Sequence, residues 1–185
     1  IMDDGFQHRK LKKDKNIILI DATNPFGGNE YLPKGRLRES LKSLNRADEL
    51  IITKSNYVDS ESLEKIRQEL LKYEKKISVA TFYEENFYNM NGEEKELNIV
   101  EDKKILIFSS IANPKIFYET VKRLKPSKIE KVEFEDHHLY KQEEISNISE
   151  MGKDYDYIIT TEKDIVKISE KIDKLLVLKM GFRIV

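Results

Sequence analysis

The first nine residues hold the densest set of chemically capable side chains in this sequence. Two adjacent carboxylates, Asp3 and Asp4, precede a glycine and then an amide, an imidazole and a guanidinium, which are Gln7, His8 and Arg9. Paired carboxylates before a glycine turn suit a Mg²⁺–nucleotide site, because Mg²⁺ prefers hard oxygen ligands and keeps several waters. The alternative is a polar loop whose aspartates cap a helix.

A nucleotide site also needs a loop that cradles the phosphates. The 185 residues contain no G-x-x-x-x-G-K-[ST] motif, and the first residue is Ile1 rather than Met. We therefore expect the chain to be the later portion of a longer protein.

A long loop with two arginines forms the second candidate site. The stretch Asp21–Gly28 directly follows an apolar run, and Leu32–Glu39 comes soon after it. α/β proteins bind ligands at the carboxyl ends of their strands. Arg36 and Arg38 could hold an anion, because a planar guanidinium binds phosphate through two hydrogen bonds. An ordinary surface loop with solvated charges is the alternative.

A pair of histidines beside an aspartate forms the third candidate site, at Asp136, His137 and His138. Neighbouring side chains on a strand point to opposite faces, so the two imidazoles are not expected to share one metal. A histidine oriented by a carboxylate fits acid–base chemistry better. A polar turn with satisfied hydrogen bonds remains the structural alternative.

Two further polar segments have simpler interpretations. Thr161 is predicted to cap a helix that carries Glu162 and Asp164 in its first turn, and Lys163 and Lys167 are expected to be solvated. The basic cluster Arg9–Lys15 is either solvated surface or a site for anionic lipid head groups, at roughly 1 kcal/mol per basic residue.

The composition limits the possible classes of partner. The 33 basic and 34 acidic side chains give a net charge of −1, which argues against a nucleic-acid binder. There is no cysteine, so disulfides and thiolate metal sites are excluded, and a reducing, cytosolic setting is favoured.

The elements that must position these residues follow an alternating pattern of strands and helices. Continuous β-branched runs, typical of parallel strands covered on both faces, occur at Asn16–Ala22, Glu49–Thr53, Lys104–Phe108, Asp156–Thr160 and Leu175–Leu178. Helical spacing follows Asp59 and Asn113, and a third helix is expected to end before Gly152 as its C′ residue. The sequence therefore predicts an α/β fold.

The middle of the chain breaks this pattern. Asn91-Gly92 lies between two strand-like flanks, which indicates a β-hairpin. We interpret this hairpin as a two-stranded connector over residues 78–103. It would separate an amino-terminal part, residues 1–77, from a carboxyl-terminal α/β lobe, residues 104–185.

Taken in order, seven motifs resemble those of the tetraacyldisaccharide 4′-kinase family of lipid A biosynthesis. The matching stretches are Asp3–Arg9 (DDGFQHR), Asp21–Gly27, Leu32–Glu39, Arg46–Asp48, Asn113–Phe117, Phe134–Tyr140 and Thr160–Lys167. The resemblance implies transfer of the γ-phosphate of ATP to the 4′-hydroxyl of a tetraacylated glucosamine disaccharide. It also implies a P-loop α/β core joined to a second α/β lobe by a two-stranded linker.

The resemblance assigns roles to individual residues. Asp3 and Asp4 match a Walker-B-like pair that organises Mg²⁺ and the phosphates, and Gln7 and His8 match the rest of that motif. Arg38 and Glu39 match a segment that helps form the active site. In this family a histidine of the Asp-His-His segment partners a catalytic aspartate. We assign that histidine to His137, with His138 as the second choice. We expect that histidine to meet the Asp3–Asp4 pair.

Three departures from the family pattern qualify these expectations. The P-loop and the catalytic-base aspartate of the family precede DDGFQHR, so this chain alone is expected to be inactive. Arg36 replaces a usual proline, and Ala112 replaces a usual glycine.

The resemblance also implies a location, because family members work at the cytoplasmic face of the bacterial inner membrane as peripheral proteins. The alternatives are a different P-loop phosphotransferase or a non-enzymatic anion- or lipid-binding module.

Overall fold

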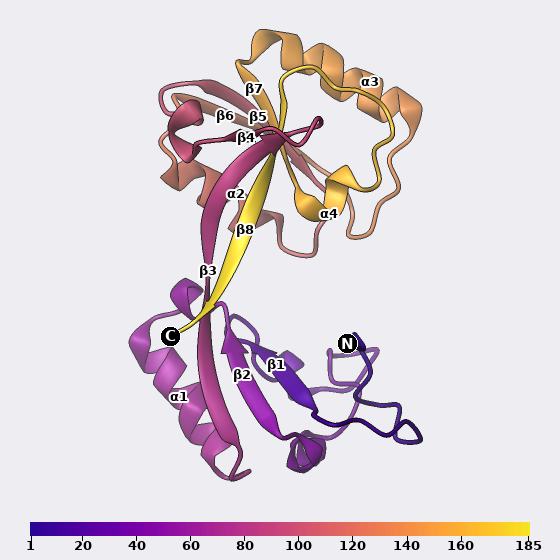
Figure 1. The fold of residues 1–185 in the computed structure, drawn as a ribbon, viewed down its shortest axis with the longest axis vertical. Helices are drawn as coiled ribbons and strands as arrows, with labels where there is room; N and C mark the ends of the chain where they lie inside the picture. Colours follow the sequence, from indigo (N-terminus) through magenta and orange to yellow (C-terminus); the bar gives the residue numbers. More distant parts are fainter. The chain divides into compact units, whose positions relative to one another are not determined.

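A computed structural model describes all residues, 1–185, and divides them into two compact units. The first unit is Ile1–Tyr83 together with Phe182–Val185, and the second is Glu84–Gly181. The chain passes between the units twice, in β3 (Lys76–Asn89) and in β8 (Leu175–Ile184), which are neighbours in the sheet (Figure 1).

The first unit is built on parallel strands. β1 (Ile17–Asp21) pairs with β2 (Glu49–Thr53), which pairs with the first residues of β3. All five residues of β2 are buried, as expected for the central strand of a parallel sheet. The helix α1 (Ser60–Leu71) covers one face of this sheet with Ile66 and Leu70 (Figure 1). The predicted cap is present, because the Asp59 carboxylate accepts the Ser62 N–H at 2.6 Å.

The second unit is a parallel sheet with helices on both faces. Its strand order is β8, β7 (Tyr157–Thr161), β5 (Lys104–Ser109) and β6 (Lys128–Glu133). α2 (Pro114–Arg123) packs on one face and α3 (Gln142–Met151) on the other, since their buried residues belong to separate apolar clusters. The short helix α4 (Glu162–Ile165) follows β7 directly.

Short elements complete the fold. β4 (Glu94–Lys95) pairs with β3 in antiparallel fashion across the Asn91-Gly92 turn, where Gly92 has a φ of +81°. The 3₁₀ helices are η1 (Gly27–Asn29), η2 (Leu41–Arg46), η3 (Ser55–Tyr57), η4 (Leu97–Val100) and η5 (Gly152–Asp154). None of the helices has the length and apolar content of a membrane-spanning segment.

The α/β class is confirmed, and each of the five predicted apolar runs lies in a strand. The structure adds β6, which the sequence analysis did not identify, and extends β8 from Leu178 to Ile184. It also draws the units differently from the predicted boundaries at 77 and 103. The Asn91-Gly92 hairpin lies inside the second unit, and β3 together with β8 connects the units. The reason is that β3 pairs with β8, which lies about 90 residues further along the chain, and no local sequence pattern predicts so distant a pairing.

Gly152 follows α3 as predicted, but it does not have the left-handed backbone of a C′ glycine. Its φ is −63°, which any residue can adopt. A Cβ atom on Gly152 would lie 2.2 Å from Cδ1 and 2.7 Å from Cγ1 of the buried Ile158. Close packing against β7 is therefore what requires glycine here.

We expect Gly152→Ala to destabilise the protein by about 1–3 kcal/mol, because overpacking outweighs the better helix propensity of alanine. Chemical denaturation measures this change. In an Ile158→Ala background both clashing atoms are gone, so the cost of Gly152→Ala should fall sharply. An equal cost in both backgrounds would mean that the contact is not the cause.

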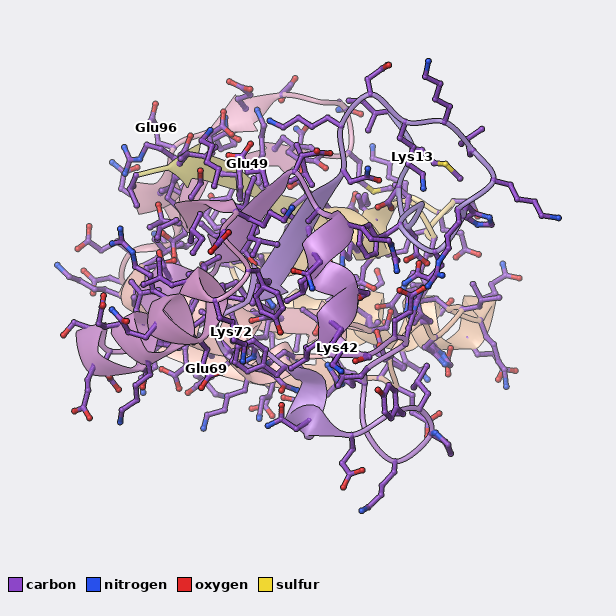
Figure 2. All side chains as sticks on the ribbon, turned by 90° about the horizontal axis from the view of Figure 1, so that it is seen from below. Lys13, Lys42, Glu49, Glu69, Lys72 and Glu96 are labelled. Atoms are coloured by element: carbon purple, nitrogen blue, oxygen red, sulfur yellow. The ribbon has the colours of Figure 1, made fainter.

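Glu49 at the start of β2 is a buried carboxylate that joins two strands. Lys15 and Lys76 lie 2.6 and 2.8 Å from its oxygens, and the Ser78 hydroxyl donates to it at 2.8 Å. These hydrogen bonds lower the pKa of Glu49 from 4.5 to about 2. Figure 2 shows Lys13 and Lys42 apart from Glu49, so neither contributes to this pairing.

A carboxyl group whose pKa is lower in the folded than in the unfolded state stabilises the fold at any pH above its unfolded-state pKa. This stabilisation is lost as the pH falls through the folded-state pKa. We therefore expect Glu49→Gln to lower the Tm at pH 7, and the gap from the native protein to close between pH 4.5 and about 2. Thermal melts followed by circular dichroism across this range test it. Glu61→Gln, which removes an exposed partner of Lys65, should change little at any pH.

Candidate functional site

The amino-terminal motif forms an exposed loop with one left-handed residue. Asp4 has a φ of +50°, a conformation that aspartate tolerates better than most side chains. Its N–H donates to Asp3 Oδ1 at 2.9 Å, and the His8 N–H donates to the Gly5 carbonyl at 3.1 Å. These hydrogen bonds hold the two carboxylates and the Gln7-His8 pair within one short turn.

Arg38 joins the first two candidate sites. Its Nη1 atom donates to Asp4 Oδ2, so the arginine from the Leu32–Glu39 segment neutralises the second aspartate of the first motif. The partners are 34 residues apart in the chain. The family resemblance assigned both segments to the active site, and the structure brings this pair of residues together.

Glu39 forms a second link between the same segments. It accepts from Arg46 at 2.6 Å and lies 3.5 Å from Arg9. The hydrogen bond from Arg46 lowers the pKa of Glu39, against the opposing effect of partial burial. The Arg46 guanidinium also lies 4.5 Å from the centre of the Phe6 ring. Arg46, at the end of η2, therefore holds both an acidic and an aromatic residue of these segments.

The loop before Arg38 closes on itself. The Arg36 N–H donates to the Gly27 carbonyl at 3.0 Å, and the Leu37 N–H donates to the Glu30 carbonyl at 3.1 Å. Gly27 has a φ of +57°, and a Cβ there would lie 3.0 Å from Arg36 Cβ. Glycine is thus required for the close approach that leads the chain toward Arg38. Arg36, expected as an anion ligand, has its backbone rather than its side chain fixed by these contacts.

Gln7 and His8 line a hollow of about 620 Å³ at the surface of the first unit. Its other lining residues are Met2, Arg9, Lys10 and Leu11. Gln7 and His8 therefore border a concave surface, and their assignment as substrate-binding residues stays a prediction.

The donor set at Asp3 and Asp4 can be tested for Mg²⁺. No cluster of three or more histidine, aspartate or glutamate side chains suitable for a metal occurs in residues 1–185. Mg²⁺ in nucleotide sites is held by one or two carboxylates and completed by phosphates and water. Two adjacent exposed carboxylates fit that requirement, and one of them is paired with Arg38.

In the second unit the two adjacent histidines have opposite environments. His138 is 26% exposed; its Nε2 lies 2.8 Å from Glu144, and its ring stacks on Phe134 at 5.0 Å. Tyr140 packs edge-on against both rings. His138 is therefore a structural histidine with its partners in place.

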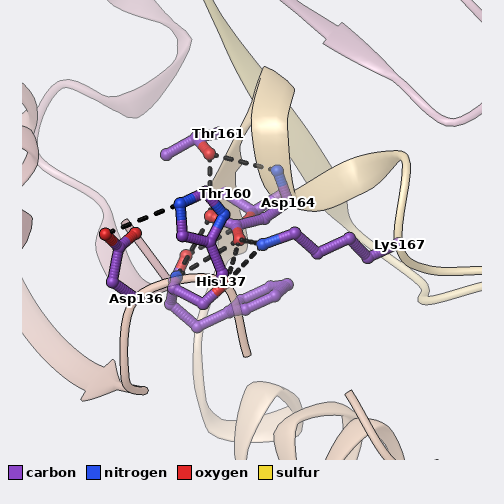
Figure 3. Close-up of polar contacts among 8 residues, drawn as sticks. Asp136, His137, Thr160, Thr161, Asp164 and Lys167 are labelled. Carbon is purple, nitrogen blue, oxygen red and sulfur yellow. Dashed lines mark hydrogen bonds and ion pairs between the residues drawn. The ribbon is translucent and has the colours of Figure 1, made fainter. Parts of the chain in front are cut away.

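His137 is 91% exposed and has a φ of +63°. Its Nε2 lies 3.8 Å from an Asp136 oxygen, too far for a hydrogen bond (Figure 3). Its backbone is fixed all the same, because its N–H donates to the Ser110 carbonyl at 3.2 Å. The imidazole is thus exposed and without a hydrogen bond, on a backbone that is held.

A buried carboxylate lies behind this loop. Asp164 is fully buried and accepts from the Ser110 hydroxyl at 2.5 Å and the Thr161 hydroxyl at 2.7 Å (Figure 3). Lys167 Nζ donates to Asp164 at 3.1 Å and to the Ser110 hydroxyl at 2.7 Å. Burial alone would raise the pKa of Asp164, but the hydrogen bonds from Ser110 and Thr161 lower it below its usual range.

The predicted cap at Thr161 is confirmed, because its hydroxyl accepts the Asp164 N–H at 3.2 Å. The interpretation of Lys167 as a solvated lysine was wrong, since its ammonium is bonded to two residues and its side chain is 18% exposed. Ser110 was missed altogether. It directly follows β5, a position that could have marked it as a candidate. The expectation that His137 meets the Asp3–Asp4 pair stays a prediction.

The fold defines an α/β protein whose polar motifs follow the ends of parallel strands. A family model described as tetraacyldisaccharide-1-P 4′-kinase matches residues 1–184. The chain therefore belongs to the tetraacyldisaccharide 4′-kinase family.

Individual relatives agree with this assignment. The tetraacyldisaccharide 4′-kinase of Halothermothrix orenii is 33% identical over 186 residues, covering 91% of this chain and 48% of the relative. That of Flavobacterium psychrophilum is 36% identical over 180 residues, covering 94% of this chain and 50% of the relative. A crystal structure of LpxK from Aquifex aeolicus in complex with ATP matches with a TM-score of 0.66 and 25% identity, covering 98% of this chain and 52% of that one. The chain spans about half the length of these relatives.

Because Arg46 contacts both Glu39 and Phe6, we expect Arg46→Ala to loosen the amino-terminal loop. The lost contacts together are worth about 1 kcal/mol, so amide exchange within residues 1–15 should accelerate several-fold. Hydrogen–deuterium exchange with mass spectrometry measures this, with the second unit unchanged. Lys42→Ala, an exposed change in the same η2 helix, is the matched control. Equal exchange in the two variants would show that Arg46 does not order the loop.

Proposed function

We propose that this chain forms part of a kinase that transfers the γ-phosphate of ATP to the 4′-hydroxyl of a tetraacylated glucosamine disaccharide in lipid A biosynthesis. In this step the bond from the γ-phosphorus to the β–γ bridging oxygen breaks, and a bond to the 4′-oxygen forms. ADP leaves, and the hydroxyl proton passes to a base. Membership of the family carries this proposal, supported by the ATP complex of the Aquifex aeolicus relative.

The contrast between the two histidines supports His137 as the one that serves catalysis. A side chain that accepts or relays the proton of the acceptor hydroxyl must be accessible and not already committed to a partner. His137 is exposed with no hydrogen bond to its ring, whereas His138 is bonded to Glu144 and stacked on Phe134. The proposal therefore takes His137 as the family's catalytic histidine.

In the first unit, Asp3 and Asp4 would hold the Mg²⁺ that accompanies ATP. When bound there, Mg²⁺ would neutralise charge on the phosphates. Arg38, which now pairs with Asp4, has a guanidinium suited to a phosphate, and Glu39 keeps Arg46 and Arg9 in place beside it. Gln7 and His8, which border the hollow, would contact the substrate.

The proposal treats the first unit as the remainder of a P-loop core and β3 with β8 as the family's two-stranded linker. Phosphoryl transfer depends on a preorganised phosphate cradle, and residues 1–185 contain no P-loop motif. We expect residues 1–185 alone to give negligible turnover.

Peripheral contact with the cytoplasmic face of the bacterial inner membrane is part of the same proposal. Arg9, Lys10 and Lys12 are exposed, and the apolar Leu11 between them is 52% exposed. Anionic lipid head groups attract such basic clusters, and an exposed apolar side chain adds to the binding.

The test is a phosphoryl-transfer assay with radiolabelled ATP and the tetraacylated disaccharide, using the complete product of the gene. We expect Asp4→Ala and His137→Ala each to lower kcat by about 10²–10⁴-fold, the usual contribution of a positioned acid–base or phosphate-organising group. His138→Gln, which keeps a donor toward Glu144, is the matched control and should retain most of the turnover.

Two results would count against the proposal. If the complete, folded gene product does not phosphorylate the disaccharide, the kinase assignment is wrong. If His137→Ala turns over at the native rate while His138→Gln does not, the roles of the two histidines are reversed.

A further inference from the structure

We propose that Asp164, acting through Ser110, is a positioning residue that holds the backbone of His137 in the conformation needed for phosphoryl transfer. This inference rests on the proposed role of His137 in the kinase reaction. It assigns a function to the Thr160–Lys167 motif, which helix capping alone does not explain.

The Asp164 carboxylate is bonded to more groups than a helix cap needs. Its two oxygens accept from Ser110 N–H at 3.2 Å each, from the Ser110 hydroxyl at 2.5 Å and from Thr161 and Lys167. A cap needs only the bond between Asp164 N–H and Thr161. The bonds from the N–H and hydroxyl of Ser110 go beyond a cap, and they fix Ser110, which is 54 residues away in the chain.

Ser110 links Asp164 to the histidine loop, because all of its polar groups are hydrogen-bonded. Its N–H and hydroxyl bond to Asp164, and its carbonyl accepts the His137 N–H at 3.2 Å. The preceding residue, Ser109, likewise accepts the Phe134 N–H at 3.0 Å. The segment after β5 is therefore the support on which the histidine loop rests, and Asp164 fixes the position of that support.

Lys167 balances the charge of this arrangement. Its ammonium bonds to both Asp164 and Ser110 and lies 5.9 Å from the centre of the Tyr140 ring. The Tyr140 hydroxyl is buried beside Ser110 and Asp164 without a partner at hydrogen-bonding geometry. Tyr140 in turn packs against His138. The buried network thus contacts the histidine loop both before and after the exposed imidazole.

A left-handed backbone at His137 makes such a support necessary. A non-glycine residue at a φ of +63° costs of order 1 kcal/mol and persists only where its surroundings enforce it. Two backbone bonds do so, from the His137 N–H to the Ser110 carbonyl at 3.2 Å and from the His138 N–H to the Glu135 carbonyl at 3.1 Å, and the first of them leads to the buried network. Weakening the Ser110 position should therefore free His137 selectively and leave His138 under the control of Glu144.

Nuclear magnetic resonance of residues 1–185 tests this without any turnover. We expect Asp164→Asn to accelerate exchange of the His137 amide about tenfold and to shift its φ-dependent coupling constant, as its acceptor moves. The His138 imidazole signals and the amides of α3 should stay unchanged. Asp173→Asn, the same chemical change at an exposed position of the second unit, is the matched control.

Ser110→Ala keeps the backbone groups but removes the hydroxyl, so it decides the question if Asp164→Asn does not fold. Unchanged exchange at His137 in the folded variants would overturn the proposal, as would equal loosening of His138 and α3. In the complete gene product, Asp164→Asn should lower kcat and leave KM for ATP unchanged. The two proposals can fail separately. If Asp164→Asn changes the His137 signals but His137→Ala keeps full activity, Asp164 does position the His137 backbone, and His137 has no role in phosphoryl transfer.

Discussion

Parallel strands must be joined by crossovers, so all their carboxyl ends lie at the same edge of the sheet, and this constraint organises both units. In the second unit Ser110 follows β5, His137 follows β6 and Asp164 follows β7, and hydrogen bonds join all three. In the first unit Asp21 ends β1, and its carboxylate contacts Lys54, which follows β2. Motifs that are far apart in the sequence thus meet because each lies directly after a strand.

The buried carboxylate of Asp164 turns this convergence into a requirement. An unpaired charge at such depth would cost several kcal/mol, and only the full set of donors from Ser110, Thr161 and Lys167 offsets that cost. The network therefore favours one relative arrangement of the three segments. Glu49 acts similarly in the first unit, where Lys15 precedes β1 and both Lys76 and Ser78 lie in β3. In both units the charged group links segments that are distant in the sequence.

The sequence predicted the elements that bury continuous apolar runs, and it missed those that do not. β2 and β5 were evident because the middle of each is a continuous apolar run, and that run is buried. β6 is an edge strand whose lysines and glutamates are mostly exposed, so its sequence has no apolar run to recognise. The site followed the same division. Arg38 and Asp4 could each be assigned to the active site from their family motifs. The contacts of Lys167 depend on Ser110, 57 residues away, and no local spacing encodes them.

The two histidines show why residue type alone cannot assign a catalytic role. They are adjacent in the sequence and chemically identical, yet one is committed to Glu144 and Phe134 and the other has no hydrogen bond to its ring. The backbone between them is left-handed at His137, and the His137 N–H is anchored on the Ser110 carbonyl. An exposed side chain and a fixed backbone are combined at this position, because the imidazole is solvated while its amide is bonded to a buried network.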